Sequence, residues 1–180
     1  MRQGPLDGFA LPEAPGVAVR LAPPAQRFVL RGAAATLAPL EAVFGVAPPA
    51  AALRSASAGG RSALWLGPDE WLLLAEGGPE VSEDSIDAAL PGVFHSLVDI
   101  SHRQIGLEIV GARAAETLAF GVALDLHPSA FPVGQVARTL FVKAEITMWR
   151  REAELWRIEV ARSFAPYAAE MLSAAISGLR

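Results

Sequence analysis

A repeated order of local signals constrains this chain more than any single residue does. The tetrapeptide Phe44–Ala47, which reads FGVA, returns as Phe120–Ala123, each time after an alanine-rich stretch with helical character. Two pairs of short apolar runs repeat in the same way: Leu64–Leu66 with Trp71–Leu73, then Thr147–Trp149 with Trp156–Ile158. Both halves follow the order strand, glycine, helix, loop, hairpin and helix. This order predicts an α+β fold built from duplicated β-α-β units with antiparallel or mixed sheets.

Apolar runs, and the turn-forming residues between them, predict the strands and helices. Gly67–Glu70 is a turn cluster between two apolar runs and predicts a hairpin. We expect strands at residues 17–21, 27–31, 53–56, 63–66, 71–75, 94–100, 104–110, 136–143, 146–150 and 155–160. We expect helices from Gly32 to Phe44, from Ser82 to Leu90, from Gly111 to Phe120 and from Ser163 to Ser177. Gly45 can end the first helix, and Ser82 can cap the second.

The composition sets the domain organisation. Residues 1–16 are rich in proline and glycine, which predicts a flexible N-terminal arm. Residues 17–92 then form a first α+β half and residues 93–180 a second. With 180 residues and 52% hydrophobic content, the two halves have enough apolar mass to form one compact unit.

Charge and residue usage exclude several function classes. The formal net charge of −4 provides no basic face for nucleic acid. The chain contains no cysteine, which removes disulfides and thiolate chemistry and fits a cytoplasmic protein. No uncharged run reaches the roughly 18–20 residues that span a bilayer, so we expect no membrane insertion.

Asp99, Ser101 and His102 are residue types found in nucleophilic triads. Ser101 and His102 are neighbours and would face opposite sides of a strand, and no G-x-S-x-G elbow is present. We therefore interpret this segment as a turn in which Asp99 and Ser101 bond to nearby backbone. His95 and His102 are too far apart along an extended chain to share a metal. We predict no catalytic, cofactor-binding or metal-binding residue in this chain.

The connector Leu124–Gly134 is the strongest candidate for a functional segment. It lies within about fifteen residues of loop, and ordered loops of this length are usually functional. Its apolar residues argue against disorder. The residues alone leave open whether it meets a ligand, a substrate or another protein.

Several segments together resemble one known family. They are Asp99–Arg103, Leu124–Pro128, Phe131–Gly134, Ala137–Thr139 and Arg162–Phe164, together with the hairpin Leu66–Leu72. In their order and spacing they resemble the gamma subunit of heterotetrameric sarcosine oxidase, from about Arg27 to Ile176. The resemblance implies a fold like that of the folate-binding domain of the glycine-cleavage T-protein.

The resemblance also implies a function within an assembly. Such oxidases demethylate sarcosine to glycine with release of hydrogen peroxide and formaldehyde, or of methylene-tetrahydrofolate. FAD, FMN and NAD belong to other subunits of that family, so the partners expected here are the alpha, beta and delta subunits. The leading hypothesis is a non-catalytic subunit that supports assembly. The candidate contact residues are Arg103, His127, Pro128, Phe131, Arg138, Arg162 and Tyr167. The alternative is a module that binds folate or another one-carbon ligand, and an independent hydrolase or transferase has no supporting constellation.

Overall fold

The computed structural model describes residues 4–179 and divides them into two units. Unit 2 comprises residues 23–102 with the short segment 134–137, and unit 1 comprises residues 4–22, 103–133 and 138–179. Both units combine one antiparallel sheet with helices, so the expected α+β class is confirmed. The expected halves, 17–92 and 93–180, are wrong at their boundaries. Strand pairing, which the local pattern does not reveal, assigns residues 17–22 to the later half.

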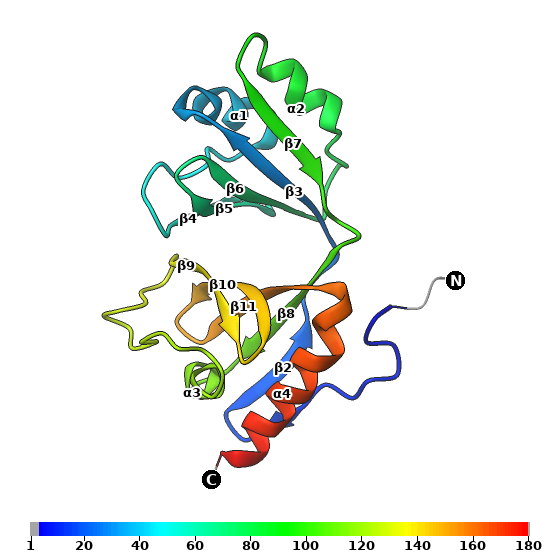
Figure 1. The fold of residues 1–180 in the computed structure, drawn as a ribbon, viewed down its shortest axis with the longest axis vertical. Coiled ribbons are helices and arrows are strands. Elements are labelled where there is room, and N and C mark those ends of the chain that lie inside the picture. The colour runs from blue at the N-terminus through cyan, green and yellow to red at the C-terminus, as the bar shows by residue number, and fades with distance from the viewer. Residues whose placement is uncertain (1–3, 180) are drawn as a thin grey trace. The chain divides into compact units, whose positions relative to one another are not determined.

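Unit 2 contains a five-stranded antiparallel sheet in the order β4-β5-β6-β3-β7 (Figure 1). Its strands are β3 (Ala25–Gly32), β4 (Ser55–Ala58), β5 (Arg61–Gly67), β6 (Glu70–Glu76) and β7 (His95–Asp99). Its helices are the 3-10 helix η1 (Ala34–Thr36), α1 (Leu37–Phe44) and α2 (Glu83–Ala89). Their buried faces form a core with the inward side chains of β3 and β6, among them Phe28, Leu30, Trp71 and Leu73.

Unit 1 contains a six-stranded sheet in the order β1-β2-β8-β11-β10-β9 (Figure 1). Its strands are β1 (Glu13–Ala14), β2 (Val17–Leu21), β8 (Gln104–Val110), β9 (Val136–Phe141), β10 (Ala144–Glu152) and β11 (Leu155–Ala161). Its helices are α3 (Ala114–Ala119), the 3-10 helix η2 (Arg162–Phe164) and α4 (Ala165–Gly178). The arm expected at residues 1–16 to be flexible is corrected for residues 4–16, because Leu6 is buried and β1 pairs with β2; residues 1–3 lie outside the described part of the chain. A two-residue strand is too short to stand out in a sequence.

The two units repeat one plan. In each unit a first strand, a helix, an edge strand, a hairpin and a second helix follow one another, as β3 to α2 and as β8 to α4. Trp71 opposes Leu30 in unit 2, and Trp156 opposes Ile109 at the same register in unit 1. The strand beside β3 is β7, which follows α2, whereas the strand beside β8 is β2, from the N-terminal part of the chain.

Local signals account for the end of α1 and the start of α2. Gly45 ends α1 in the left-handed conformation with φ 84°. The Ser82 side chain accepts a hydrogen bond from the Ser85 amide at 3.1 Å and so caps α2. No helix among residues 4–179 is long and apolar enough to cross a membrane.

His95 ties the start of β7 to α2 and gives unit 2 a pH-dependent contact. Its Nδ1 lies 2.7 Å from the Val93 carbonyl oxygen and its Nε2 lies 2.9 Å from Asp87 Oδ1. Both neighbours are acceptors, so only the imidazolium satisfies both at once. The bond to Val93, then the bond to Asp87, raises the pKa of His95 above 6.5, and partial burial opposes this.

We therefore expect the free energy of unfolding to fall as the pH rises through the raised pKa of His95. A group whose pKa is higher in the folded state stabilises that state fully at a pH below its unfolded pKa. This contribution is lost as the pH rises through its folded pKa. Urea titrations from about pH 5 to about pH 9 measure the effect. His95→Gln should flatten this part of the profile, and His102→Gln, a change at an exposed histidine, should leave it intact. Equal slopes in all three proteins would contradict the assignment.

Candidate functional site

The connector after α3 is held onto unit 1 by one aromatic side chain. Phe131 is only 2% exposed, and its ring centroid lies 5.1 Å from that of Trp156 on β11. Leu126 is buried as well. Phe131 is therefore a core residue, and its expected role as a partner contact is wrong. A loop residue that is buried in the core and one that contacts a partner are both apolar, so the sequence does not distinguish them.

Arg150 on β10 also binds the connector, at the turn that contains Phe131. Its guanidinium donates to the Phe131 carbonyl oxygen at 2.8 Å and to the Ala153 carbonyl oxygen at 2.9 Å. It also lies 5.1 Å from the centroid of the Trp156 ring, within the range of cation–π attraction. The connector is thus ordered by contacts within unit 1.

The outer side of the connector carries the polar residues expected there. Asp125 accepts a hydrogen bond from the His127 amide at 2.9 Å, and His127 Nδ1 lies 2.7 Å from Ser129 Oγ. His127 and Pro128 are exposed, which is compatible with a partner contact. The His127 side chain is arranged by hydrogen bonding within this turn.

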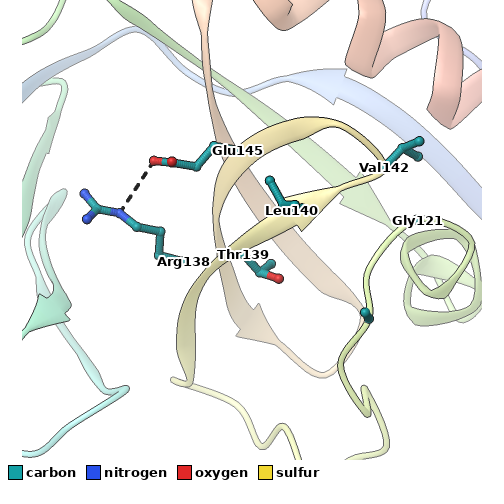
Figure 2. Close-up of a pocket in the computed structure, with 7 residues that line it drawn as sticks. Gly121, Arg138, Thr139, Leu140, Val142 and Glu145 are labelled. Carbon is teal, nitrogen blue, oxygen red and sulfur yellow. Dashed lines mark ion pairs between the residues drawn. The ribbon is translucent and has the colours of Figure 1, made fainter.

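A cavity of about 440 Å³ lies between the end of α3 and the hairpin of β9 and β10 (Figure 2). Its lining residues are Gly121, Ala123, Arg138, Thr139, Leu140, Val142 and Glu145. Figure 2 shows the side chains of Arg138 and Glu145 pointing toward one another, with Nε 3.8 Å from Oε1. At this distance the pair is a loose ion contact, which contributes little to stability at a surface.

The hairpin tip packs tightly against the chain at Gly121. The Val142 amide donates to the Gly121 carbonyl oxygen at 2.7 Å. A Cβ on Gly121 would lie 2.7 Å from both the Phe141 ring and a Val142 methyl group, so glycine is required by close approach. Val142 itself has φ 56°, which is rare for a β-branched residue and costs roughly 1–3 kcal/mol. The surrounding contacts hold this strained turn against the cavity.

Two exposed apolar side chains, Leu140 and Val142, line this cavity, and two more exposed apolar residues flank its lining residues Gly121 and Ala123 in the sequence. Leu140 is 54% exposed and Phe120 is 58% exposed, and Leu124 and Val142 are also accessible. We call Phe120, Leu124, Leu140 and Val142 the β9 patch. Such a patch beside charged groups is typical of a protein interface. The sequence analysis did not single out Phe120, Leu140 or Val142, although exposed apolar residues in an edge-strand hairpin, such as Leu140 and Val142, are a usable signal.

The remaining candidates lie elsewhere in unit 1. Arg103 and Arg162 line a second cavity, of about 550 Å³, and the Arg162 amide donates to the Arg103 carbonyl oxygen at 2.8 Å. Tyr167 lies on α4 with its ring edge-on to Phe164, at a centroid distance of 6.4 Å. The structure therefore brings Arg103 and Arg162 together. Arg138 lies at the first cavity and His127 on the connector.

Asp99 and Ser101 have the structural role expected of a turn. The Ser101 amide donates to Asp99 Oδ1 at 2.7 Å, and Ser101 Oγ accepts from the Arg27 amide at 2.9 Å. The bond to Arg27 joins segments far apart in the sequence, which local reasoning did not predict. Within residues 4–179, no group of three or more His, Cys, Asp or Glu side chains is placed to hold a metal ion.

Sequence comparison assigns the chain to a family. The model of the sarcosine oxidase, gamma subunit family matches residues 31–177. The chain belongs to this family. It is 35% identical to sarcosine oxidase subunit gamma of Corynebacterium sp. strain U-96 over 141 residues, which cover 78% of this chain and 68% of that relative. The subunit gamma of strain P-1 is 32% identical over 137 residues, or 76% of this chain and 67% of the relative.

Solved structures agree with membership of the gamma subunit family. A chain of heterotetrameric sarcosine oxidase from Corynebacterium sp. U-96, in complex with pyrrole 2-carboxylate, matches with a TM-score of 0.87 and 30% identity. The match covers 98% of this chain and 95% of that chain. Glycine cleavage system aminomethyltransferase T from Bartonella henselae matches with a TM-score of 0.63 and 14% identity, over 87% of this chain and 45% of that chain. This second likeness shows the fold alone and confirms the expected T-protein-like architecture.

Proposed function

We propose that this chain is a non-catalytic subunit that supports assembly of a heterotetrameric, flavin-dependent sarcosine oxidase. The observation that carries the proposal is the match along nearly the whole chain to a chain of such an oxidase. Membership of the gamma subunit family supports it independently. The alpha, beta and delta subunits are the proposed partners.

In this proposal the complex oxidatively demethylates sarcosine to glycine, with hydrogen peroxide and either formaldehyde or methylene-tetrahydrofolate as further products. FAD, FMN and NAD are bound by the other subunits, and the complex works in the cytoplasm. The role of this chain is to provide a contact surface for the other subunits. Its interior contacts, such as those of Arg150 with the connector, hold that surface in one conformation.

The β9 patch is the proposed contact surface in unit 1. It combines exposed apolar side chains with the Arg138 and Glu145 charges, and β9 is the outermost strand of its sheet. A few well-packed side chains near the centre of an interface supply most of its binding energy, and charges at its rim guide orientation. The Val142 turn, held against Gly121, keeps the patch in a fixed shape.

Leu140→Asp is expected to weaken association with the other subunits by about tenfold or more, because it buries an unpaired carboxylate in an apolar contact. The measurement is the amount of chain that co-purifies with the flavin-containing subunits after co-expression, followed by a titration of the purified parts. Val43→Asp in unit 2 changes another exposed apolar residue and should leave association unchanged.

The outcomes of this experiment test the proposed subunit role and the proposed contact surface separately. If the wild-type chain does not co-elute with the flavin absorbance, the proposed subunit role is wrong. If the wild-type chain and Leu140→Asp associate equally well, the role stands and the β9 patch is not the contact.

The folate-binding alternative is supported by the fold likeness to aminomethyltransferase T. It predicts a higher Tm of the isolated chain in the presence of tetrahydrofolate, because a ligand that binds the native state stabilises it by mass action. The subunit proposal predicts no shift, so one thermal titration distinguishes the two.

A further inference from the structure

The two sheets differ at one edge although they share one plan. In unit 1 the order ends in β8-β2-β1, and in unit 2 it ends in β3-β7. The register of the paired strands makes β7 the counterpart of β2. Among the described residues, unit 2 therefore lacks the strand that corresponds to β1.

Backbone contacts fix this equivalence residue by residue. Gly32 donates to the Asp69 carbonyl oxygen at 3.0 Å, and Gly111 donates to the Glu154 carbonyl oxygen at 2.8 Å, at the same point of each hairpin. Counting from these glycines, Ser96 pairs with Arg31 as Ala18 pairs with Val110. Leu97 then corresponds to Val19, and Phe94 corresponds to Gly16.

In unit 1 an extended segment covers the outer edge of β2. Glu13 pairs with Ala18, and the Val19 amide donates to the Pro12 carbonyl oxygen at 2.9 Å. The turn between β1 and β2 fills the space beside Gly111, where a Cβ would collide with the Gly16 carbonyl. The Gly16 carbonyl oxygen also accepts from the Arg113 amide at 3.0 Å.

In unit 2 the Thr36 methyl group takes the place directly beside Gly32, and no strand within residues 4–179 covers the adjoining surface, where a cavity of about 640 Å³ lies. Its lining includes Gly32, Ala33, Ala35, Asp69, Phe94 and His95. Phe94 is 96% exposed, so its ring projects almost wholly into solvent beside the cavity. Aromatic residues, phenylalanine among them, are enriched at protein interfaces.

The outer edge of β7 also presents main-chain groups. The Ile100 amide donates inward to the Arg27 carbonyl oxygen at 2.8 Å, and the Asp99 amide donates to Glu83 Oε1 at 2.8 Å. Amides alternate in direction along a strand, so Leu97 faces outward as Asp99 does. Leu97 thus presents the N–H that its counterpart Val19 donates to the arm. Glu83 closes the far end of this edge.

We infer that an extended segment of another subunit of the oxidase pairs with the outer edge of β7 opposite His95–Leu97 and takes the place that β1 has in unit 1. The inference rests on the proposed subunit function. The added strand places an apolar side chain in the cavity beside Phe94. It carries a basic side chain near Glu83 and Asp99, whose carboxylates lie at the far end of the edge. Strand addition to an open sheet edge is an established mode of recognition.

The occupant is a different subunit because the matched chain of known structure comes from a heterotetramer. The internal copy shows that the corresponding edge in unit 1, that of β2, accepts an extended segment. A second copy of this chain is the competing source, and the test below includes it.

Hydrogen–deuterium exchange on the co-purified complex and on the full-length isolated chain tests the pairing. We expect the Leu97 amide to exchange at least about tenfold more slowly in the complex, because a ladder hydrogen bond protects it. Phe94→Ala should weaken association about tenfold or more, the size typical of an anchoring aromatic. Since Phe94 makes little contact within its own chain, the Tm of the Phe94→Ala variant should equal that of the wild type. The control variant Val43→Ala, at another exposed apolar residue, should associate normally.

Two results would overturn the inference while leaving the subunit function in place. One is a complex in which Leu97 exchanges as fast as in the isolated chain and Phe94→Ala associates like the wild type. The other is an isolated chain that dimerises through Phe94 with Leu97 already protected, which would identify a second copy as the occupant. Failure of the wild-type chain to join any complex would instead overturn the subunit function, and this inference with it.

Discussion

Phe131→Ala is expected to lower the free energy of unfolding by about 3–5 kcal/mol, the range for loss of a buried phenylalanine. The ring is only 2% exposed and packs on Trp156, so its removal leaves a cavity between the connector and the sheet. Urea titration followed by tryptophan fluorescence measures the loss, because Trp156 reports directly on this contact.

The matched control is Val133→Ala, two residues further along the same connector. Val133 is 51% exposed, and a surface substitution of this kind usually changes stability by less than about 0.5 kcal/mol. A loss at Phe131 no larger than the loss at Val133 would contradict the assignment of Phe131 to the core. It would return the residue to the surface role that its sequence suggested.

Arg150→Ala is expected to lower the free energy of unfolding by about 2–4 kcal/mol. Each of the two guanidinium bonds to carbonyl oxygens is of a kind that contributes about 1.5–3 kcal/mol, and relief of the buried charge offsets part of the sum. Arg150→Lys should recover only a fraction, because an ammonium group lacks the planar fork that reaches both carbonyls. The measurement is the same urea titration.

Arg113→Ala is the comparison variant for this prediction. Arg113 forms an exposed pair with Glu116 on α3, and a surface pair of this kind contributes little. If Arg150→Ala were no more harmful than Arg113→Ala, the connector would not depend on the guanidinium. The double variant of Phe131 and Arg150 should lose less than the sum of the two single losses, because both side chains hold the same turn.

Local chemistry accounts for the parts of the fold that the sequence predicted well. The strand expected at 104–110 is observed with the same bounds, and Ser82 and Gly45 delimit helices as expected. The hairpin around Pro68 and Asp69 also forms. In each case the deciding interaction lies within a few residues of the signal.

Pairings between distant segments account for the differences. Nothing near Val17–Leu21 indicates that this strand pairs with β8 rather than with its sequence neighbour β3. The burial of Phe131 depends on Trp156 and Arg150, which lie well beyond the connector in the sequence. The connector's own residues therefore suggest an interface role for Phe131 and do not reveal that it is buried. The repeated FGVA segment likewise has two roles: Phe44 is buried, and Phe120 is 58% exposed. An identical tetrapeptide can therefore contribute a core residue in one copy and an exposed residue in the other.

The pairing of β2 with β8 has a consequence for the order in which the chain matures on the ribosome. Unit 2, apart from residues 134–137, is complete once residue 102 has emerged, and domains generally fold as they are made. Residues 17–21 emerge early, yet their partner strand follows only after all of that unit, and β11 follows later still. During synthesis the N-terminal strand thus lacks its β8 partner until unit 2 has been made. The neighbouring strand β1, which also pairs with β2 in the folded structure, can shield one edge of this strand from wrong pairing in the meantime.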